Sequence, residues 1–217
     1  MLVPAFGRGE RLGADKLWLE VEGRPLVAFA LEAAGVAGCF HRLVIAAPEG
    51  RWAELRDIAA AAGFHDVDLV AGGRRRQDSV ASALRRAPDA EIVCVHDGAR
   101  PLVPPHLFND VVVAAAAHRA ATTAVPCVDT VKRVAEGYVV ETLERDSLVA
   151  TQTPQAFERA LLEAAHADAE SSGVDASDDA LLVERLGVRV AVVAGDVRNF
   201  KVTHPHDLEV MKALLRP

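Results

Sequence analysis

Residues 92–101 read IVCVHDGARP, an apolar run that ends in a turn carrying Asp97, Gly98 and Arg100. The run 92–95 predicts a strand, and Ala-rich amphipathic stretches separate it from similar runs elsewhere in the chain. Strands that alternate with helices in this way predict an α/β fold with a mostly parallel sheet and helices on both faces. Because such sheets bind ligands at the carboxyl ends of their strands, the turn after residue 95 is the first candidate for a functional site.

Other strands are predicted at residues 2–6, 43–47, 67–71 and 188–193, and helices at residues 25–36, 52–62, 79–87, 105–118, 157–169 and 207–215. The rhythm breaks near the middle of the chain. There, residues 128–134 and 138–143 alternate polar and apolar residues around a turn at 135–137, which predicts a β-hairpin. A hairpin with little core of its own is expected to pack on something else. We therefore expect one domain, residues 1–217, with a projecting β-arm at about residues 126–148.

The charge and cysteine content narrow the class of protein. The 217 residues include 24 Lys+Arg and 31 Asp+Glu, which gives a formal net charge of −7. This acidic balance argues against nonspecific nucleic-acid binding, and no apolar run reaches the roughly 18 residues of a membrane-spanning helix. Cys39, Cys94 and Cys127 are scattered singly, which predicts neither a zinc site nor a disulfide framework and suits a reducing cytoplasm. We expect a cytoplasmic protein whose partners are neither nucleic acid nor membrane.

The first predicted strand leads into PAFGRGERLG at residues 4–13, with Lys16 just beyond. Glycines directly after a strand allow a sharp turn, and the exposed N–H groups of such a loop can hold phosphates. The spacing is neither a dinucleotide-binding GxGxxG motif nor a P-loop. Two nearby cations favour a nucleoside triphosphate, and the alternative is an ordinary glycine-rich turn with solvated charges. The candidates are Ala5, Gly7 and Gly9 for nucleotide binding and Arg11 and Lys16 for catalysis.

A second glycine motif, GGRRRQDSV, occupies residues 72–80. Its paired glycines would let a flat ring or a phosphate approach closely, and Ser79 could cap the following helix or contact a ligand. Gly73 and Ser79 are therefore candidate nucleotide-binding residues. Three successive arginines usually form a solvated surface, so we expect at most one of them to reach the site.

In the turn 96–101, Asp97 is a candidate ligand of Mg²⁺, which proteins bind through one or two carboxylates plus phosphate oxygens. Arg100 can hold a phosphate through its planar guanidinium group. The alternative is a turn that an Asp97–Arg100 ion pair stabilises. His96 taken alone is typical of a core histidine rather than of a ligand.

Polar residues also gather late in the chain. Arg145 follows the predicted hairpin, and residues 151–155 (TQTPQ) precede a predicted helix. Residues 177–179 (SDD) are typical of a helix N-cap, which is the favoured interpretation for the two aspartates. Lys201 lies near a strand end, where a lone lysine is usually solvated.

Taken in this order, the segments resemble the 2-C-methyl-D-erythritol 4-phosphate cytidylyltransferase family of the non-mevalonate isoprenoid pathway. The motifs that carry the resemblance are PAFGRGERL with its following K, GG…R..SV, VHDGARP, DTVKR, TPQ and NFKVTHPHDL, which run from Pro4 to Leu208. The resemblance implies a Rossmann-like nucleotidyltransferase fold with a β-arm that crosses to a partner in a homodimer. It also implies Mg²⁺, CTP as donor and pyrophosphate as product.

The resemblance also implies roles for individual positions. It places Arg11 and Lys16 on the triphosphate, Gly73 and Ser79 beside the cytosine and ribose, Asp97 on a metal ion or ribose, and Arg100 beside the substrate. It matches Lys201 to a lysine of the substrate phosphate, and Thr130, Arg145 and Thr153 to arm-region positions that reach the methylerythritol phosphate of the partner. Ser177 keeps a hydroxyl where the family often has threonine.

The predicted reaction is cytidylyl transfer, in which the phosphate of methylerythritol phosphate attacks the α-phosphorus of CTP. No protein nucleophile is needed, because the attacking group is already an anion, and cations would reduce its repulsion by the triphosphate. Three alternatives stay open. They are a related enzyme such as a ribitol-5-phosphate cytidylyltransferase, a dinucleotide-dependent oxidoreductase, against which the missing GxGxxG counts, and a non-catalytic nucleotide-binding protein.

Overall fold

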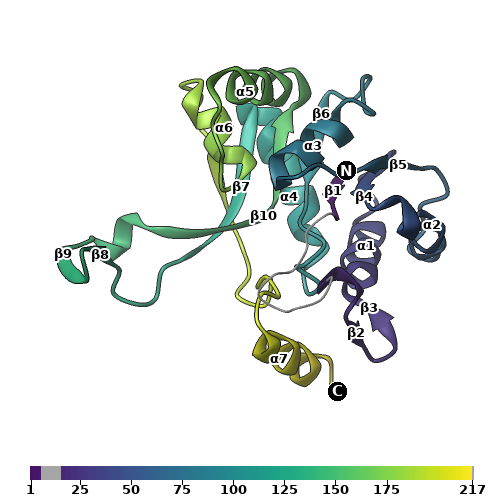
Figure 1. Ribbon diagram of the computed structural model, residues 1–217, viewed down its shortest axis with the longest axis horizontal. Helices are drawn as coiled ribbons and strands as arrows, with labels where there is room; N and C mark the ends of the chain where they lie inside the picture. The colour runs from purple at the N-terminus through teal and green to yellow at the C-terminus, as the bar shows by residue number, and fades with distance from the viewer. Residues whose placement is uncertain (6–15, 217) are drawn as a thin grey trace.

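A seven-stranded sheet forms the centre of the computed structural model, which describes residues 1–5 and 16–216 (Figure 1). Its strands, in spatial order, are β11 (Ala191–Ala194), β7 (Ala120–Pro126), β10 (Val149–Glu158), β6 (Ile92–Val95), β1 (Leu2–Pro4), β4 (Leu43–Ala47) and β5 (Val67–Ala71). β10 runs antiparallel to both of its neighbours, and the other adjacent pairs are parallel. The predicted mostly parallel sheet is thereby confirmed.

Helices cover both faces of this sheet (Figure 1). The α-helices are α1 (Leu26–Ala37), α2 (Trp52–Ala61), α3 (Arg76–Leu84), α4 (His106–His118), α5 (Arg159–Ser172), α6 (Asp179–Arg185) and α7 (Pro205–Leu215). The described residues also form the short 3-10 helices η1 (Lys16–Trp18), η2 (Glu49–Arg51) and η3 (Arg145–Ser147). Because side chains alternate between the faces of a strand, Val3 packs in a core with α1, α2 and α4, whereas Leu2 packs in a core with α3, α5 and α6.

A third and smaller core joins the C-terminal helix α7 to the start of the chain. The short strands β2 (Glu20–Val21) and β3 (Arg24–Pro25) pair just before α1. Val21 and Phe29 from this region pack against Met211 of α7 and against Val202, which is also fully buried. The segment that carries Lys201 is therefore held in place by Val202, which packs against β2, α1 and α7.

The predicted elements differ from the structure mainly in its second half. Strands β7 and β10 were not predicted, and the helix predicted at 157–169 begins only at Arg159, because Phe157 is a buried residue of β10. The polar residues of β7 and β10 bond to each other inside the sheet: Gln155 Nε2 donates to Thr122 Oγ1 at 3.0 Å. Buried polar pairs of this kind hide the apolar pattern by which strands are predicted from sequence.

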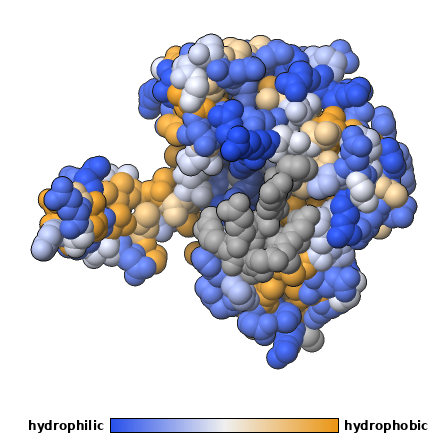
Figure 2. Space-filling model, viewed as in Figure 1, coloured by the Kyte–Doolittle hydropathy of each residue, from blue (hydrophilic) through white to orange (hydrophobic). Residues whose placement is uncertain are grey.

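The predicted hairpin is present as β8 (Lys132–Ala135) and β9 (Tyr138–Thr142), joined by a turn in which Glu136 and Gly137 both have positive φ. It stands away from the rest of the protein (Figure 1), and apolar side chains show along it in Figure 2. Val134 and Tyr138 are 59% and 77% exposed. Because every residue of β8 and β9 is exposed, the arm has no core of its own. A two-stranded hairpin of this kind is marginally stable alone.

Within residues 1–5 and 16–216, no helix is both long enough and apolar enough to cross a membrane.

The contact between α1 and the end of α2 predicts the effect of a glycine substitution. A Cβ added at Gly35 would lie 1.9 Å from the carbonyl oxygen of Ala62. We expect Gly35→Ala to lower the free energy of unfolding by about 1–3 kcal/mol through overpacking, although alanine is the better helix former. Urea unfolding measures this, with Gly50→Ala as control, since nothing lies within 4 Å of a Cβ there. Equal unfolding midpoints for the two variants would contradict the prediction.

Candidate functional site

A cavity of about 370 Å³ lies at the carboxyl end of β6, beside its antiparallel neighbour β10. The predicted site residues that line it are Asp97, Arg100, Thr153, Ser177 and Lys201, and Arg76 lines it as well. These residues come from separate parts of the chain: the end of β6, strand β10, the segment before α6, the start of α3 and the segment before α7. The structure therefore brings together five of the residues that the sequence singled out.

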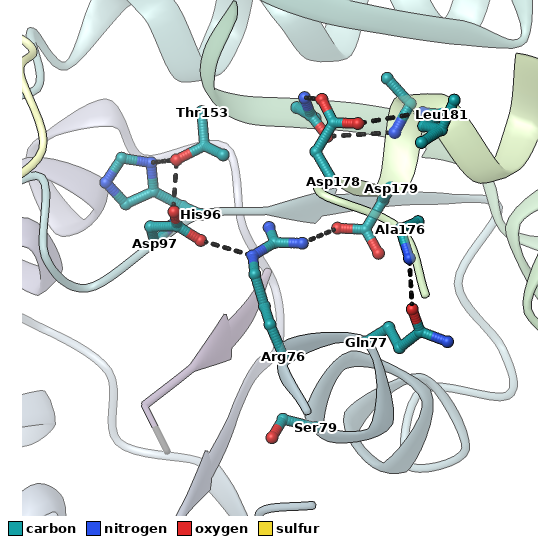
Figure 3. A network of polar contacts seen from close by, with 12 residues as sticks. Arg76, Gln77, Ser79, His96, Asp97, Thr153, Ala176, Asp178, Asp179 and Leu181 are labelled. Atoms are coloured by element: carbon teal, nitrogen blue, oxygen red, sulfur yellow. Dashed lines mark hydrogen bonds and ion pairs between the residues drawn. The ribbon is translucent and has the colours of Figure 1, made fainter. Parts of the chain in front are cut away.

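Asp97 lies at the centre of the polar contacts around this cavity (Figure 3). Its Oδ1 accepts a hydrogen bond from Arg76 Nε at 2.9 Å, and its Oδ2 accepts one from Lys201 Nζ at 2.7 Å. Its backbone N–H donates to Thr153 Oγ1 at 3.0 Å. Burial alone would raise the pKa of this carboxyl, but the charges of Arg76 and Lys201 hold the pKa well below its usual range. Asp97 is therefore an anion clamped between two cations.

The same arginine joins Asp97 to a second buried carboxylate. Arg76 Nη1 donates to Asp179 Oδ2 at 2.7 Å (Figure 3). Asp179 Oδ1 lies 3.1 Å from His166 Nε2. Burial opposes the charged form of each partner, yet the pKa of Asp179 is lowered and that of Arg76 is raised by their mutual attraction. Asp178 caps α6 by accepting from Leu181 N, as predicted, but the same interpretation of Asp179 is wrong. Asp179 is fully buried instead, with Arg76 and His166 as the partners of its carboxylate.

Thr153 links Asp97 to the buried His96. Thr153 Oγ1 lies 3.2 Å from His96 Nδ1, and the imidazole packs edge-on against Phe108 with ring centroids 5.0 Å apart. His96 is completely buried, and its burial lowers the pKa of the imidazole to about 4. The expectation that His96 is a core histidine matches this environment.

The side chain of Arg100 bonds to a backbone carbonyl oxygen rather than to the carboxylate of Asp97. Its Nη1 donates to the carbonyl oxygen of Asn199 at 2.7 Å, and burial lowers the pKa of its guanidinium group. The alternative of a turn stabilised by an Asp97–Arg100 pair therefore does not describe the turn, since Asp97 pairs with Arg76 and Lys201 instead. Arg76 Nη2 and Arg100 Nε are buried and have no hydrogen-bond partner among the described residues. Buried donors without a partner are uncommon and mark places where water or a ligand completes the bonding.

The second glycine motif is used inside the fold. Ser79 Oγ accepts from the N–H of Gly73 at 3.0 Å, and a Cβ at Gly73 would lie 2.2 Å from Asp78 Cβ. Ser79 is fully buried and lies within α3, which begins at Arg76, so the expectation that Ser79 caps the helix is wrong. The nucleotide contacts predicted for Gly73 and Ser79 stay predictions, because neither residue lines the cavity just described.

The first glycine motif falls mostly outside the part of the chain that the structure describes. Gly7, Gly9 and Arg11 lie outside it, as does the side chain of Lys16, whose backbone opens η1. Ala5 is buried where β1 ends, and its N–H donates to the carbonyl oxygen of Ala46 at 2.8 Å. The roles predicted for these five residues remain predictions.

Two predicted site residues lie on the arm side of the molecule rather than at the cavity. Thr130 is exposed just before β8. Arg145 is exposed in η3, where its Nη1 donates to the carbonyl oxygen of Val128 at 3.0 Å. Neither lines the cavity of its own chain. The roles predicted for them in a second subunit stay predictions.

Several site residues were missed by the sequence analysis. Gln152 Oε1 accepts from Asn199 Nδ2 at 3.2 Å, and Asn199 Nδ2 also donates to the carbonyl oxygen of Thr153 at 2.8 Å. Gln155 joins β10 to the α6 cap, because its Nε2 donates to Asp178 Oδ2 at 2.8 Å. The signal in the sequence was the pair of amide side chains in TQTPQ, together with the amide of Asn199. A buried strand carries amide side chains only where other groups satisfy their hydrogen bonds.

Comparison with known proteins identifies the family. The sequence model of 2-C-methyl-D-erythritol 4-phosphate cytidylyltransferase matches residues 1–217. The chain belongs to this family.

Similar cytidylyltransferases match along almost the whole chain. The 2-C-methyl-D-erythritol 4-phosphate cytidylyltransferase of Bacillus pumilus is 42% identical over 220 residues, which cover 99% of this chain and 96% of that one. The protein of the same name from Bacillus licheniformis is 39% identical over 218 residues, covering 99% and 94%.

Solved structures show the same cytidylyltransferase fold. The crystal structure of 4-diphosphocytidyl-2C-methyl-D-erythritol synthase from Anaerococcus prevotii superposes with a TM-score of 0.89 at 28% identity, covering 100% of this chain and 97% of that one. The crystal structure of the cytidylyltransferase from Thermus thermophilus gives a TM-score of 0.80 at 35% identity, covering 98% and 97%. The predicted Rossmann-like nucleotidyltransferase fold with its hairpin is thereby confirmed.

The lowered pKa of His96 predicts a pH dependence of stability. The pKa of the imidazole is near 6.5 in the unfolded chain and about 4 in the folded chain. Below about pH 6.5 the unfolded chain binds a proton that the folded chain does not, so the free energy of unfolding falls as the pH drops from 6.5 toward 4. Between pH 7 and pH 5 we expect the wild type to lose about 2 kcal/mol more unfolding free energy than a His96→Gln variant. Urea unfolding at the two pH values measures the difference. Parallel pH dependences of the two proteins would refute this assignment.

Proposed function

We propose that the cavity between the ends of β6 and β10 is where this chain transfers the cytidylyl group of CTP to 2-C-methyl-D-erythritol 4-phosphate, with release of pyrophosphate. Membership of the family supports this activity. The structural observation that carries it is the convergence of Arg76, Arg100 and Lys201 on one cavity, in a chain whose net charge is −7. Cations gathered in an acidic protein are suited to a strongly anionic substrate.

The chemistry requires two anions to meet. A phosphate oxygen of the acceptor attacks the α-phosphorus of CTP, and the bond from that phosphorus to the pyrophosphate oxygen breaks. We assign Lys201 and Arg145 to the acceptor phosphate and Arg11 and Lys16 to the triphosphate, where they reduce the repulsion and hold both reactants in line. Asp97, Arg100, Thr130, Thr153 and Ser177 would complete the acceptor pocket, and Ala5, Gly7, Gly9, Gly73 and Ser79 the nucleotide pocket.

The metal ion that fits this site is one carried by the nucleotide. No group of three or more His, Cys, Asp or Glu side chains that could hold a metal ion occurs among residues 1–5 and 16–216. Asp97 lines the cavity as a carboxylate, and each of its oxygens accepts one bond from a cation and keeps a second lone pair. Mg²⁺ with one or two carboxylates and the phosphate oxygens of its substrate is the usual arrangement. We propose that Asp97 would be the protein contact of a Mg²⁺ ion bound to the phosphates of CTP, where the ion would neutralise phosphate charge.

The working enzyme, we propose, is a cytoplasmic homodimer in which one domain of residues 1–217 extends its arm, residues 126–148, to a partner. Exposed apolar side chains along β8 and β9 support this, since a hairpin without a core gains most by packing on another surface. The placement of Thr130 and Arg145 outside their own cavity supports it further. In such a dimer each active site would combine the cavity of one chain with the arm of the other.

Release of pyrophosphate tests the activity. With Mg²⁺ present, we expect CTP and 2-C-methyl-D-erythritol 4-phosphate to give pyrophosphate at a rate on the order of 10²-fold above ATP or GTP, because base contacts must be satisfied by hydrogen bonds. Ribitol 5-phosphate should be a poor acceptor. A preference for ribitol 5-phosphate would reassign the acceptor, and a protein whose melting temperature rises with CTP but which releases no pyrophosphate would be a nucleotide-binding protein only.

A mixed dimer tests the shared active site. Arg145→Ala and Lys201→Ala should each abolish most activity, because each removes a cation from both sites. When the two chains carry different tags and are co-purified as a mixed dimer, one site holds both changes and the other holds neither. We expect this dimer to recover about half of the wild-type rate. A mixed dimer as inactive as its parents would show that the arm serves its own chain.

A further inference from the structure

Arg76 lines the cavity but has no assigned contact with either substrate. It is the last of three consecutive arginines and the first residue of α3. Arg75 pairs with Asp78 within the same turn, whereas the side chain of Arg76 crosses to the cavity and is 23% exposed. Its two contacts are both to carboxylates, Asp97 and Asp179.

On one side, Arg76 controls the placement of a cation that we assign to the acceptor. Arg76 Nε holds Asp97 Oδ1, and the other oxygen of the same carboxylate holds Lys201 Nζ. The ammonium group of Lys201 thus takes its position from a carboxylate that Arg76 orients. Without Arg76, the carboxylate of Asp97 would be free to rotate together with the lysine.

On the other side, the first turn of α3 holds the segment that precedes α6. Arg76 binds Asp179, and Gln77 accepts from the N–H of Ala176 at 2.9 Å (Figure 3). Gln77 also donates to the carbonyl oxygen of Val174 at 2.9 Å. Ser177, which lines the cavity, lies between these anchors. Two neighbouring residues of α3 therefore fix the turn that presents the Ser177 hydroxyl.

Resting on the proposed function, we propose that Arg76 is a positioning residue for the acceptor: through Asp97 it orients Lys201, and through Asp179 it orients the turn that carries Ser177. The planar guanidinium group suits this role, because it presents N–H donors in fixed directions to two carboxylates at once. A lysine carries its donors on a single nitrogen and cannot present them to both carboxylates in the same directions.

Steady-state kinetics with each substrate varied in turn tests this role. We expect Arg76→Lys to lower kcat/KM for 2-C-methyl-D-erythritol 4-phosphate by about 10- to 100-fold, as the loss of an orienting contact does elsewhere, while KM for CTP changes less than about threefold. The matched control is Arg159→Lys, a change at an arginine that is 17% exposed and pairs with Glu163 away from the cavity. It should leave both constants within about twofold of the wild type.

A loss of stability alone must be separated from a loss of positioning. Leu162→Ala removes a fully buried side chain of α5 and should lower the melting temperature at least as much as Arg76→Lys does, with little change in KM for the acceptor. Asp179→Asn keeps an oxygen for Arg76 and removes one charge. Its kcat/KM for the acceptor should therefore lie between the values of the wild type and of Arg76→Lys. If Arg76→Lys does not fold, Asp179→Asn decides.

Two results would overturn the proposal. One is an acceptor kcat/KM in the folded Arg76→Lys variant, or otherwise in Asp179→Asn, within twofold of Arg159→Lys. The other is an equal rise in KM for CTP and for the acceptor. Should the wild type use no acceptor, the proposed function fails by itself. Calorimetric titration with inorganic phosphate then still tests Arg76, because Arg76→Lys should weaken phosphate binding about tenfold relative to Arg159→Lys.

Discussion

The arrangement of this protein depends on two carboxylates that are buried and ionised. Asp97 and Asp179 lie out of water, where a lone charge is costly, and Arg76 between them satisfies both. Breaking a buried pair of this kind by removing one partner costs about 3–5 kcal/mol. The network therefore requires α3, α6 and the end of β6 to meet in one geometry, and His166 of α5 and Lys201 extend it at either end.

This charge network rests on apolar packing that is in place around it. Strand β4 is buried along its whole length between two cores and pairs with β1. This pairing fixes the position of β1 in the sheet. Val202 follows Lys201 directly, is completely buried, and donates its N–H to the carbonyl oxygen of Ala99 at 2.8 Å. The lysine is thus delivered to the cavity by a hydrophobic anchor beside it. The arm has no such support and is exposed throughout β8 and β9.

Prediction from sequence succeeded where one physical signal dominates. The runs 43–47, 67–71 and 92–95 match β4, β5 and β6 because their apolar residues are covered by helices. It failed at β10, where Gln152 and Gln155 are buried yet polar, since the partners that satisfy them lie 23 or more residues away in the chain. Likewise, Asp179 follows a capping residue and reads as a second one, although its partner Arg76 is far away in the chain.

Taken alone, the amino-acid order determined the α/β class, the order of motifs that marks the family, the hairpin, and five residues of the cavity, because periodicity and turn chemistry are local properties of the chain. Tertiary structure decided which arginine of three enters the cavity, that Asp97 pairs with Arg76 and Lys201 rather than with Arg100, and that Asp179 is buried. Those outcomes depend on which charges meet away from water, and burial is settled only when distant segments pack together.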